Sequence, residues 1–595
     1  MLFAAEQFHE HGGTMREFLL GNEAIARGAW EAGVKFVSGY PGTPSTEIIE
    51  TLAMRFPETN PRWSANEKVA FEEGMGAAIG GLRVLVTMKH VGLNVAADAF
   101  MVFPYSGTNG GFVVISADDP GMHSSQNEQD NRYLARVGKV PVLEPSDAQE
   151  CHDFMIAGLE LSEQFKSPVM LRTTTRLAHH KGLVEVGERR EVEKKEFVRD
   201  AKRFSVPIYR LIRRPEVEKT LNALTAYAET CSFNRMEHND NKSIGVVTSG
   251  IAYQYVKEVM PNAGVLRLGM TFPLPANLLR EFCSQYETVY VIEEGEPFIE
   301  EYMRNLGIAN LKGKEIFGLI GEYSPGRLRS ALALGDPPKP FTEQVNLIPR
   351  PPMMCVGCGH RTVFAALKQL KVTVSGDIGC YTMGALPPYE AEHTTFCMGA
   401  SIGVAVGLEQ AGHKDTVAII GDSTFIHSGI PPLIDAVYNK SHLTLVILDN
   451  SATGMTGSQQ NPASGKNLLG EETLKLDLEA FCRATGVGSV EVVDTWQRKE
   501  IVNTLRRAIA YKGPAVVIAR GPCNQLPEIK KRHVIPFVVE EELCTKCDAC
   551  FKVWCPAITR TEQNFPVIAA NECTSCTVCA QVCPTDAIKL AEAFA

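Results

Sequence analysis

Residues 416–450 read TVAIIGDSTFIHSGIPPLIDAVYNKSHLTLVILDN, and this stretch decides the fold. Its short apolar runs at 416–420 and 443–448 are rich in β-branched residues, which is typical of strands buried in a parallel sheet. The residues between the two runs suit a crossover helix. The stretch therefore predicts an α/β protein with a doubly wound parallel sheet.

Each of the two predicted strands ends in polar residues. Asp422 follows the first strand and Asn450 follows the second. Open α/β sheets bind ligands at the carboxyl ends of their strands, so these two side chains should lie side by side. Such hard oxygen ligands suit Mg²⁺, which completes its shell with phosphate oxygens and water. The alternative is that both residues only cap strand–helix turns.

The composition limits the class of protein. The 595 residues suffice for roughly three to five domains. An apolar content of 45% and a charged content of 22% are those of an ordinary folded protein, and the net charge of −10 argues against nucleic acid as a partner. The first twenty residues lack the apolar core of a signal peptide, and no run approaches the ~18 apolar residues of a membrane helix. We expect a cytoplasmic protein with no membrane partner.

Eight of the 17 cysteines lie between residues 544 and 583 in two groups of four, each ending in Cys-Pro. The second group reads C-x2-C-x2-C-x3-C-P, and the first has one extra residue before its last cysteine. In a reducing compartment such cysteines are metal ligands rather than disulfides. Zinc is the alternative, but structural zinc sites usually pair two C-x2-C hairpins instead of using triplets.

The triplet spacing indicates two [4Fe–4S] clusters, each completed by the last cysteine of the other group. The segment resembles a bacterial two-cluster ferredoxin. One predicted ligand set, called the outer set below, is Cys544, Cys547, Cys550 and Cys583. The other, called the inner set, is Cys555, Cys573, Cys576 and Cys579.

Several motifs resemble those of the thiamine-diphosphate-dependent 2-oxoacid:ferredoxin oxidoreductases. Gly421-Asp422-Ser423 and Asp449-Asn450 are similar to the thiamine signature G-D-G…N-N, with Ser423 and Asp449 as departures. CVGCGHR at 355–361 and DIGCYTMG at 377–384 are similar to cofactor loops of that family. Taken alone, Cys355 and Cys358 would also suit half a zinc site or two buried thiols.

The resemblance implies thiamine diphosphate and Mg²⁺ as cofactors. The metal would be held by Asp422, Asn450 and the backbone carbonyl of Ala452. The residues implied to contact the cofactor are Glu67, Cys358, Gly359, His360, Cys380, Gly421, Asp422, Ser423 and Asn450.

The N-terminal half carries the catalytic residues that the resemblance implies. The loop YPGTPS at 40–45 is similar to a family loop in which Thr43 would face substrate or cofactor. Thiamine enzymes place a carboxyl group against N1′ of the aminopyrimidine, and Glu67 fits this role, with Glu72 and Glu73 as competing residues. The polar loop 118–135 resembles that of the arylpyruvate enzymes. Its candidate pocket residues, which would otherwise be merely solvated, are His123, Gln126, Gln129 and Asp130.

Five regions are expected. They are a pyrimidine-binding thiamine domain (15–185), a charged linker (186–242), a third domain similar to the transketolase C-terminal domain (243–340), a diphosphate- and Mg²⁺-binding thiamine domain (341–530) and a C-terminal α+β ferredoxin-like domain (535–595).

The resemblance implies oxidative decarboxylation of an arylpyruvate such as indolepyruvate, with coenzyme A as co-substrate and ferredoxin as electron acceptor. Two clusters in tandem suit a reaction that releases two electrons which must be accepted singly. The implied partner is a small beta (gamma-type) subunit in an alpha2beta2 heterotetramer. Alternatives are the same chemistry on pyruvate or a branched-chain 2-oxoacid, or an electron-transfer subunit whose thiamine fold has lost activity.

Overall fold

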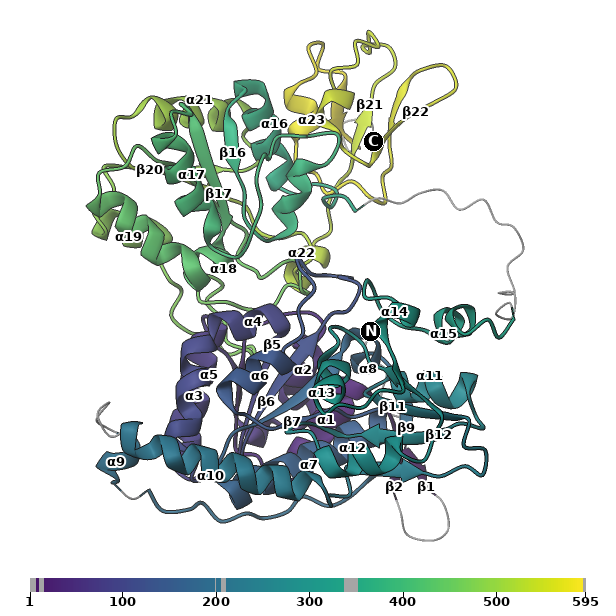
Figure 1. Cartoon of the computed structure of the whole chain (residues 1–595). Helices are drawn as coiled ribbons and strands as arrows, with labels where there is room; N and C mark the ends of the chain where they lie inside the picture. Colours follow the sequence, from purple (N-terminus) through teal and green to yellow (C-terminus); the bar gives the residue numbers. More distant parts are fainter. Residues whose placement is uncertain (1–6, 10–14, 198, 205–209, 336–351, 592–595) are drawn as a thin grey trace. The chain divides into compact units, whose positions relative to one another are not determined.

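The computed structural model describes residues 7–9, 15–197, 199–204, 210–335 and 352–591, and the chain divides into two compact units, 1–345 and 346–595 (Figure 1). The expected boundary at residues 340 and 341 lies outside the described residues. Within the described residues no helix is long and apolar enough to cross a membrane.

The first unit is built on a seven-stranded sheet of order β13-β7-β8-β6-β5-β3-β4. All its neighbouring strands are parallel except β13 and β7. The strands are β3 (Phe36–Gly39), β4 (Pro61–Trp63), β5 (Val84–Lys89), β6 (Phe112–Asp118), β7 (Val142–Leu143), β8 (Val169–Thr174) and β13 (Met270–Phe272). Four phenylalanines, Phe71, Phe100, Phe103 and Phe112, pack edge to face in its core.

The helices around this sheet include α1 (Gly21–Glu31), α2 (Thr46–Arg55), α3 (Glu67–Ile79), α4 (His90–Val95), α5 (Ala97–Ser106) and α7 (Ala148–Phe165). A second sheet in the first unit has the order β10-β12-β11-β14-β15. Its strands are β10 (Asn234–Glu237), β11 (Ile244–Ser249), β12 (Gly264–Leu268), β14 (Thr288–Ile292) and β15 (Leu311–Lys312).

The segment expected as a charged linker contains regular structure. Helix α10 (Arg210–Ala228) lies within it, and β10 pairs antiparallel with β12. Val217, Leu224 and Ala228 are buried at spacings of seven and four residues, so they form one apolar stripe along the helix. The many charges occupy the remaining faces, which is why the composition resembled that of a solvated connection.

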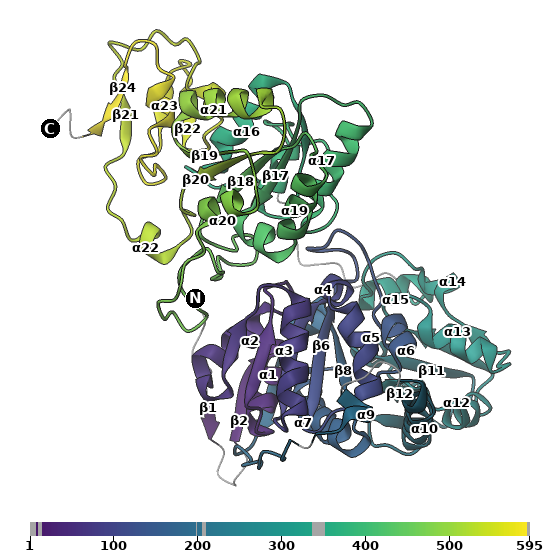
Figure 2. The same cartoon turned by 90° about the vertical axis from the view of Figure 1, so that its left-hand side faces the viewer.

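The second unit holds a five-stranded parallel sheet of order β16-β17-β18-β20-β19 (Figure 2). Its strands are β16 (Thr373–Ser375), β17 (Thr416–Gly421), β18 (Thr444–Asp449), β19 (Ser489–Asp494) and β20 (Ala515–Arg520). Side chains of β17 alternate between two cores, because successive residues of a strand face opposite sides. Val417 and Ile419 face α16 (His360–Leu370) and α21 (Arg498–Ala510), whereas Ala418 and Ile420 face α17 (Ala400–Gln410) and α19 (Ile430–Tyr438). The predicted doubly wound sheet is therefore present.

The C-terminal part is a small α+β structure with two strand pairs, β21 (Phe537–Val539) with β24 (Ile588–Leu590) and β22 (Ile558–Arg560) with β23 (Pro566–Ile568). Its core contains Phe537, Ile558, Ile568 and Ile588 together with several of the cysteines. The apolar core is small, so bound metal clusters would contribute much of the stability of this region.

Candidate active site and iron–sulfur sites

The residues predicted to bind Mg²⁺ meet at the carboxyl ends of β17 and β18, which are neighbours in the sheet. The carboxylate of Asp422 accepts hydrogen bonds from the backbone N–H groups of Ser423 (2.6 Å) and Ser451 (2.7 Å). Asn450 Oδ1 accepts one from the backbone N–H of Ala452 (3.0 Å). The loop after β18 thus packs against Asp422, so the three predicted metal ligands, which come from two neighbouring strand ends, lie near one another.

The electrostatics of this turn fit a bound cation. Burial and the neighbouring charge of Asp449 raise the pKa of Asp422 to about 8. Asp449 is itself buried and pairs with Arg520 at 2.8 Å. A buried carboxyl group with an anion beside it is unfavourable as a carboxylate unless a cation compensates it. The donor set therefore fits Mg²⁺, although its role as a ligand set stays a prediction.

His360 begins α16 close to the same turn. Its Nε2 atom lies 3.5 Å from Asn450 Nδ2, and its buried Nδ1 atom has no hydrogen-bond partner. Burial lowers the pKa of His360 to about 4, so the ring is neutral. With Nε2 accepting from the amide, Nδ1 carries the proton, and an N–H beside a helix N-terminus fits a phosphate oxygen.

The other predicted cofactor residues line the same end of the sheet. Gly421 ends β17, and a Cβ at this position would come within 2.8 Å of Tyr381. Ser423 shares a hydrogen bond with Thr453 (2.9 Å) in the loop after β18. Gly359 precedes α16, where a Cβ would meet the Thr495 hydroxyl. Ser423 is thus accommodated by a polar neighbour where the family motif has glycine.

A third group of four thiols lies beside this turn, and no cysteine spacing in the sequence predicted it. It consists of Cys355, Cys358, Cys380 and Cys523 and is called the third set below. Burial and then the thiols of Cys523 and Cys355 raise the pKa of Cys380 to about 11. Burial raises that of Cys358 to about 12, with Cys355 and Cys380 adding to the shift. The backbone N–H of Cys523 donates to the carbonyl of Asn450 (3.0 Å), so the third set adjoins the predicted metal loop.

The sequence contains only a weak signal for this third set. Cys380 and Cys523 stand alone in DIGC and GPC, far along the chain from the C-x2-C pair. Only their placement at neighbouring strand ends brings them together. Four thiols fit a [4Fe–4S] cluster by residue type, although within the described residues no three of them lie close enough together to hold a metal ion.

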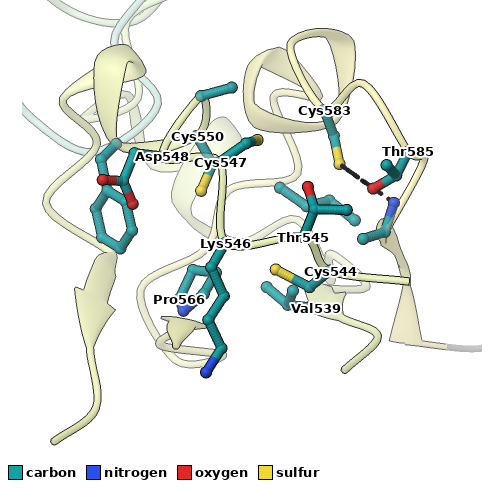
Figure 3. Close-up of a pocket in the computed structure, with 14 residues that line it drawn as sticks. Val539, Cys544, Thr545, Lys546, Cys547, Asp548, Cys550, Pro566, Cys583 and Thr585 are labelled. Atoms are coloured by element: carbon teal, nitrogen blue, oxygen red, sulfur yellow. Dashed lines mark hydrogen bonds between the residues drawn. The ribbon is translucent and has the colours of Figure 1, made fainter. Parts of the chain in front are cut away.

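The outer set lines one cavity in the C-terminal region, as Figure 3 shows. Cys544, Cys547 and Cys550 come from one loop, and Cys583 comes from the second group. The backbone N–H of Ala587 donates to Cys583 Sγ (3.2 Å). Although burial acts in the opposite direction, hydrogen bonds from Thr585 and Ala587 lower the pKa of Cys583. The cavity therefore joins the four cysteines that the spacing grouped.

The inner set also comes together across the two groups. Burial raises the pKa of Cys579 to about 12, and the thiols of Cys576, Cys573 and Cys555 add to the shift. Both predicted sets thus draw on both cysteine groups, and their assignment as cluster ligands stays a prediction.

The two triplet loops have the same backbone shape. Lys546 and Ser575, each two residues after the first cysteine, have φ of 53° and 55°. Asp548 and Thr577, each directly after the second cysteine, have φ of 64° and 67°. The repeated left-handed positions make the loops pseudo-symmetric, as expected of a ferredoxin-like pair.

The predicted catalytic glutamate begins α3 in the first unit. Asn66 caps this helix, its side chain accepting from the backbone N–H of Val69 (2.9 Å). Glu67 follows the carboxyl end of β4, where the backbone N–H of Ser64 donates to the carbonyl of Gly39 at the end of β3. The carboxyl group therefore lies at the ligand-binding edge of the first sheet.

The three competing glutamates differ in burial. The side chain of Glu67 is buried, whereas Glu72 is exposed and pairs with Lys68. Glu73 is half-buried and accepts a hydrogen bond from Ser64 Oγ (2.7 Å). A carboxyl group that shares a proton with a cofactor needs a water-poor setting, and Glu67 has it.

Gly92 in α4 leaves the space that the Glu67 side chain occupies. A Cβ at Gly92 would lie 2.7 Å from both Cγ and Oε1 of Glu67. Gly92→Ala should displace the carboxyl group and lower turnover about 100-fold, because a shift of about 1 Å in a catalytic group has this effect. The measurement is kcat beside the melting temperature.

Gly76→Ala in α3 is the matched control, because a Cβ there meets nothing within 4 Å. This variant should keep full turnover. Wild-type kcat in Gly92→Ala would show that the position of the Glu67 carboxyl group does not matter for the reaction.

Thr43 lies in the loop between β3 and α2, and its carbonyl accepts from Ser124 Oγ (3.3 Å). Lys89, at the end of β5, donates to the carbonyl of Ser124 (2.6 Å), and burial lowers the pKa of Lys89 to about 8. The polar loop thus packs on the Thr43 loop. Lys89 is a further buried cation at the ligand-binding edge of the first sheet, and no motif in the sequence predicted it.

The candidate pocket residues of this polar loop have different environments. Asp130 is buried in an ion-pair network with Arg132 and Arg172, which gives it a structural role. His123 Nε2 lies 3.1 Å from the Glu322 carboxylate. Gln126 is exposed. Gln129 exchanges two hydrogen bonds with the Asn94 amide (2.8 and 2.9 Å).

Three family models match the chain. "Pyruvate flavodoxin/ferredoxin oxidoreductase, thiamine diP-bdg" matches residues 27–247, "Thiamine pyrophosphate enzyme, C-terminal TPP binding domain" matches 377–519, and "4Fe-4S binding domain" matches 566–589. Together with the parallel sheets they define an oxidoreductase of the 2-oxoacid:ferredoxin type, as predicted, with thiamine-diphosphate-binding and [4Fe–4S]-binding domains.

Proteins named "Indolepyruvate oxidoreductase subunit IorA" are similar over nearly the whole chain. The Archaeoglobus fulgidus protein is 42% identical and the Methanothermobacter marburgensis protein 42%, over 97% and 96% of this chain and 97% of each relative. The Pyrococcus horikoshii protein is 38% identical over 96% of both chains. The chain belongs to the family of these IorA proteins, one subunit of a multi-subunit enzyme. This decides against the reading as a non-catalytic electron-transfer subunit.

Proposed function

We propose that the protein oxidatively decarboxylates an arylpyruvate, indolepyruvate above all, with coenzyme A. The products are arylacetyl-CoA and CO₂, and two electrons pass to ferredoxin. The observation that carries this proposal is the similarity to IorA proteins over nearly the full length of both chains. The 2-oxoglutarate synthase subunit KorA of Methanothermobacter thermautotrophicus is 28% identical over only 31% of this chain.

Each candidate residue has a defined task in this reaction. The chemistry that thiamine diphosphate would supply here, when bound, is a carbon nucleophile for the 2-oxo group and a sink for the charge left by CO₂. Glu67, whose carboxyl group is buried, would face N1′ of the aminopyrimidine and act as the acid–base group that activates the cofactor. Asp422, Asn450 and the carbonyl of Ala452 would hold Mg²⁺, and the neutral His360 would donate to a phosphate oxygen. Thr43 and Lys89 would bind the anionic substrate.

The three thiol sets would act in series from the thiamine domain to the C-terminal region. The third set adjoins the Asn450 loop. The inner set follows, because Cys573 and Cys576 line a cavity together with Asp494 and Trp496 of the thiamine domain. The cavity of the outer set is lined only by residues 539–588. [4Fe–4S] clusters bound to all three sets would supply one-electron acceptors, and the outer set would be the exit toward ferredoxin.

The iron content tests this arrangement. Anaerobically purified protein should contain about twelve irons per chain, four for each set. Cys380→Ser should lower this to about eight and leave the clusters of the C-terminal region intact, as followed by EPR. Eight irons in the wild type, unchanged in Cys380→Ser, would show that the third set binds no cluster.

The substrate and the partner are tested together. We propose a small beta (gamma-type) subunit as the partner in an alpha2beta2 heterotetramer, with an interface above ~2,000 Å², as is usual for obligate subunits. The chain co-expressed with this subunit should reduce ferredoxin fastest with arylpyruvates and coenzyme A. The chain alone should bind cofactors but turn over slowly. Faster turnover with pyruvate or a branched-chain 2-oxoacid would contradict the aryl assignment, and full activity of the single chain would contradict the partner.

A further inference from the structure

Arg361, on the first turn of α16, joins two segments that carry different thiol sets. Its Nε atom donates to the carbonyl of Cys355 (2.7 Å), and its Nη2 atom donates to the carbonyl of Met354. Its Nη1 atom donates to the carbonyl of Trp554 (2.7 Å) and to the hydroxyl of Tyr389 (3.1 Å). Cys355 belongs to the third set, and Trp554 directly precedes Cys555 of the inner set. The guanidinium group of Arg361 therefore bonds to the backbone beside both thiol sets.

Trp554 is the extra residue that distinguishes the first cysteine group from the second. It has φ of 54°, in the left-handed region, whereas Val582, which directly precedes the last cysteine of the second group, has φ of −101°. Its ring packs edge to face on Tyr389 at 5.2 Å, and Lys368 Nζ lies 5.4 Å from the ring centre. The insertion thus turns the Trp554 carbonyl toward Arg361.

The charge of Arg361 has no carboxylate partner within the described residues, where every hydrogen bond it donates goes to a neutral oxygen. Its side chain is nearly buried, with 7% of the residue exposed. A buried cation is costly unless an anion compensates it. The thiolate-held clusters on either side would be that anion, since a [4Fe–4S] group with four thiolates carries net negative charge.

We propose that Arg361 is a positioning residue that holds the Cys355–Cys358 turn against the Trp554–Cys555 turn and places a positive charge between the third and inner clusters. It thereby fixes the separation of the two clusters and raises the reduction potential of both. The inference rests on the proposed function, because it needs clusters in these sets. The planar guanidinium group of arginine can donate to four oxygens at once in this geometry, whereas the single ammonium group of lysine cannot.

Three variants of the anaerobically purified, cluster-loaded enzyme distinguish the effect of the Arg361 charge from that of its hydrogen bonds to the two turns. Arg361→Met removes both, Arg361→Lys keeps the charge, and Arg507→Met removes an exposed arginine that pairs with Glu491 on the surface. EPR-monitored potentiometric titration gives the potential of each cluster. Magnetic coupling between clusters reports their separation.

In Arg361→Met the reduced-to-oxidised ratio of the third and inner clusters at a fixed potential should fall about tenfold, which is 59 mV for a one-electron couple. The outer cluster should not change. Arg361→Lys should keep the potentials close to those of the wild type but alter the coupling between the two clusters. Arg507→Met should match the wild type in both.

The proposal is overturned if fully loaded Arg361→Met titrates like Arg507→Met. If Arg361→Met loses iron from the third and inner sets, the test passes to Arg361→Lys. Unchanged magnetic coupling between the two clusters in Arg361→Lys would show that Arg361 does not fix their separation. A wild-type enzyme without iron in the third set would instead refute the third-set assignment. The effect of Arg361 on the inner cluster would then still be measured by the same titration.

Discussion

Glu67→Gln should retain thiamine diphosphate and lose turnover by about 10²–10⁴-fold, the usual contribution of a positioned acid–base group. An amide has nearly the size of the carboxyl group, so the buried site at the start of α3 should remain folded. It cannot share a proton with the aminopyrimidine, so the cofactor would bind without being activated. Cofactor content and kcat are the two measurements.

Glu72→Gln is the matched control for this variant. Glu72 lies on the same helix but is exposed and pairs with Lys68, so its replacement should leave kcat within about twofold of the wild type. Full activity in Glu67→Gln, with a loss in Glu72→Gln or in a Glu73 variant, would move the role to one of these residues.

Asp422→Ala should instead act on cofactor binding. The carboxylate accepts hydrogen bonds from the N–H groups of Ser423 and of Ser451 in the loop after β18 and lies beside the charge of Asp449, an arrangement that a metal ion would stabilise. Loss of this ligand should weaken retention of Mg²⁺ and thiamine diphosphate by more than the about 10–100-fold typical of an outer-shell partner. Calorimetric titration of the cofactor in the presence of Mg²⁺ measures the change.

Asp435→Ala provides the control, because Asp435 is exposed on α19 and accepts only from the Asn439 side chain in its own helix. It should bind the cofactor with wild-type affinity. Equal affinity in Asp422→Ala would show that the turn after β17 does not hold the metal.

The sequence predicted the second sheet and its ligand edge because the information is local. The runs at 416–420 and 443–448 have the composition of buried parallel strands, and the polar residue after each must lie at the same edge. The cysteine triplets are equally local, since short fixed spacings define each loop. In such stretches neighbouring residues alone determine the geometry.

Other features depended on residues far apart in the chain. The third set joins Cys355, Cys358, Cys380 and Cys523, which only the packing of three loops brings together. The position of Gly92 against Glu67 follows from the packing of α4 on α3. Helix α10 was hidden because its apolar residues are few beside its charges. Spacing rules cannot detect contacts of this kind.

Cluster reduction by substrate tests whether a thiamine site in this chain passes electrons to the chain's own iron–sulfur sets. The enzyme with its partner subunit is mixed under anaerobic conditions with indolepyruvate and coenzyme A, without ferredoxin, and frozen for EPR. We expect reduced [4Fe–4S] signals within a single turnover, and none in Glu67→Gln or after removal of thiamine diphosphate. Clusters that dithionite reduces, but that no 2-oxoacid reduces in the presence of coenzyme A and thiamine diphosphate, would contradict the account.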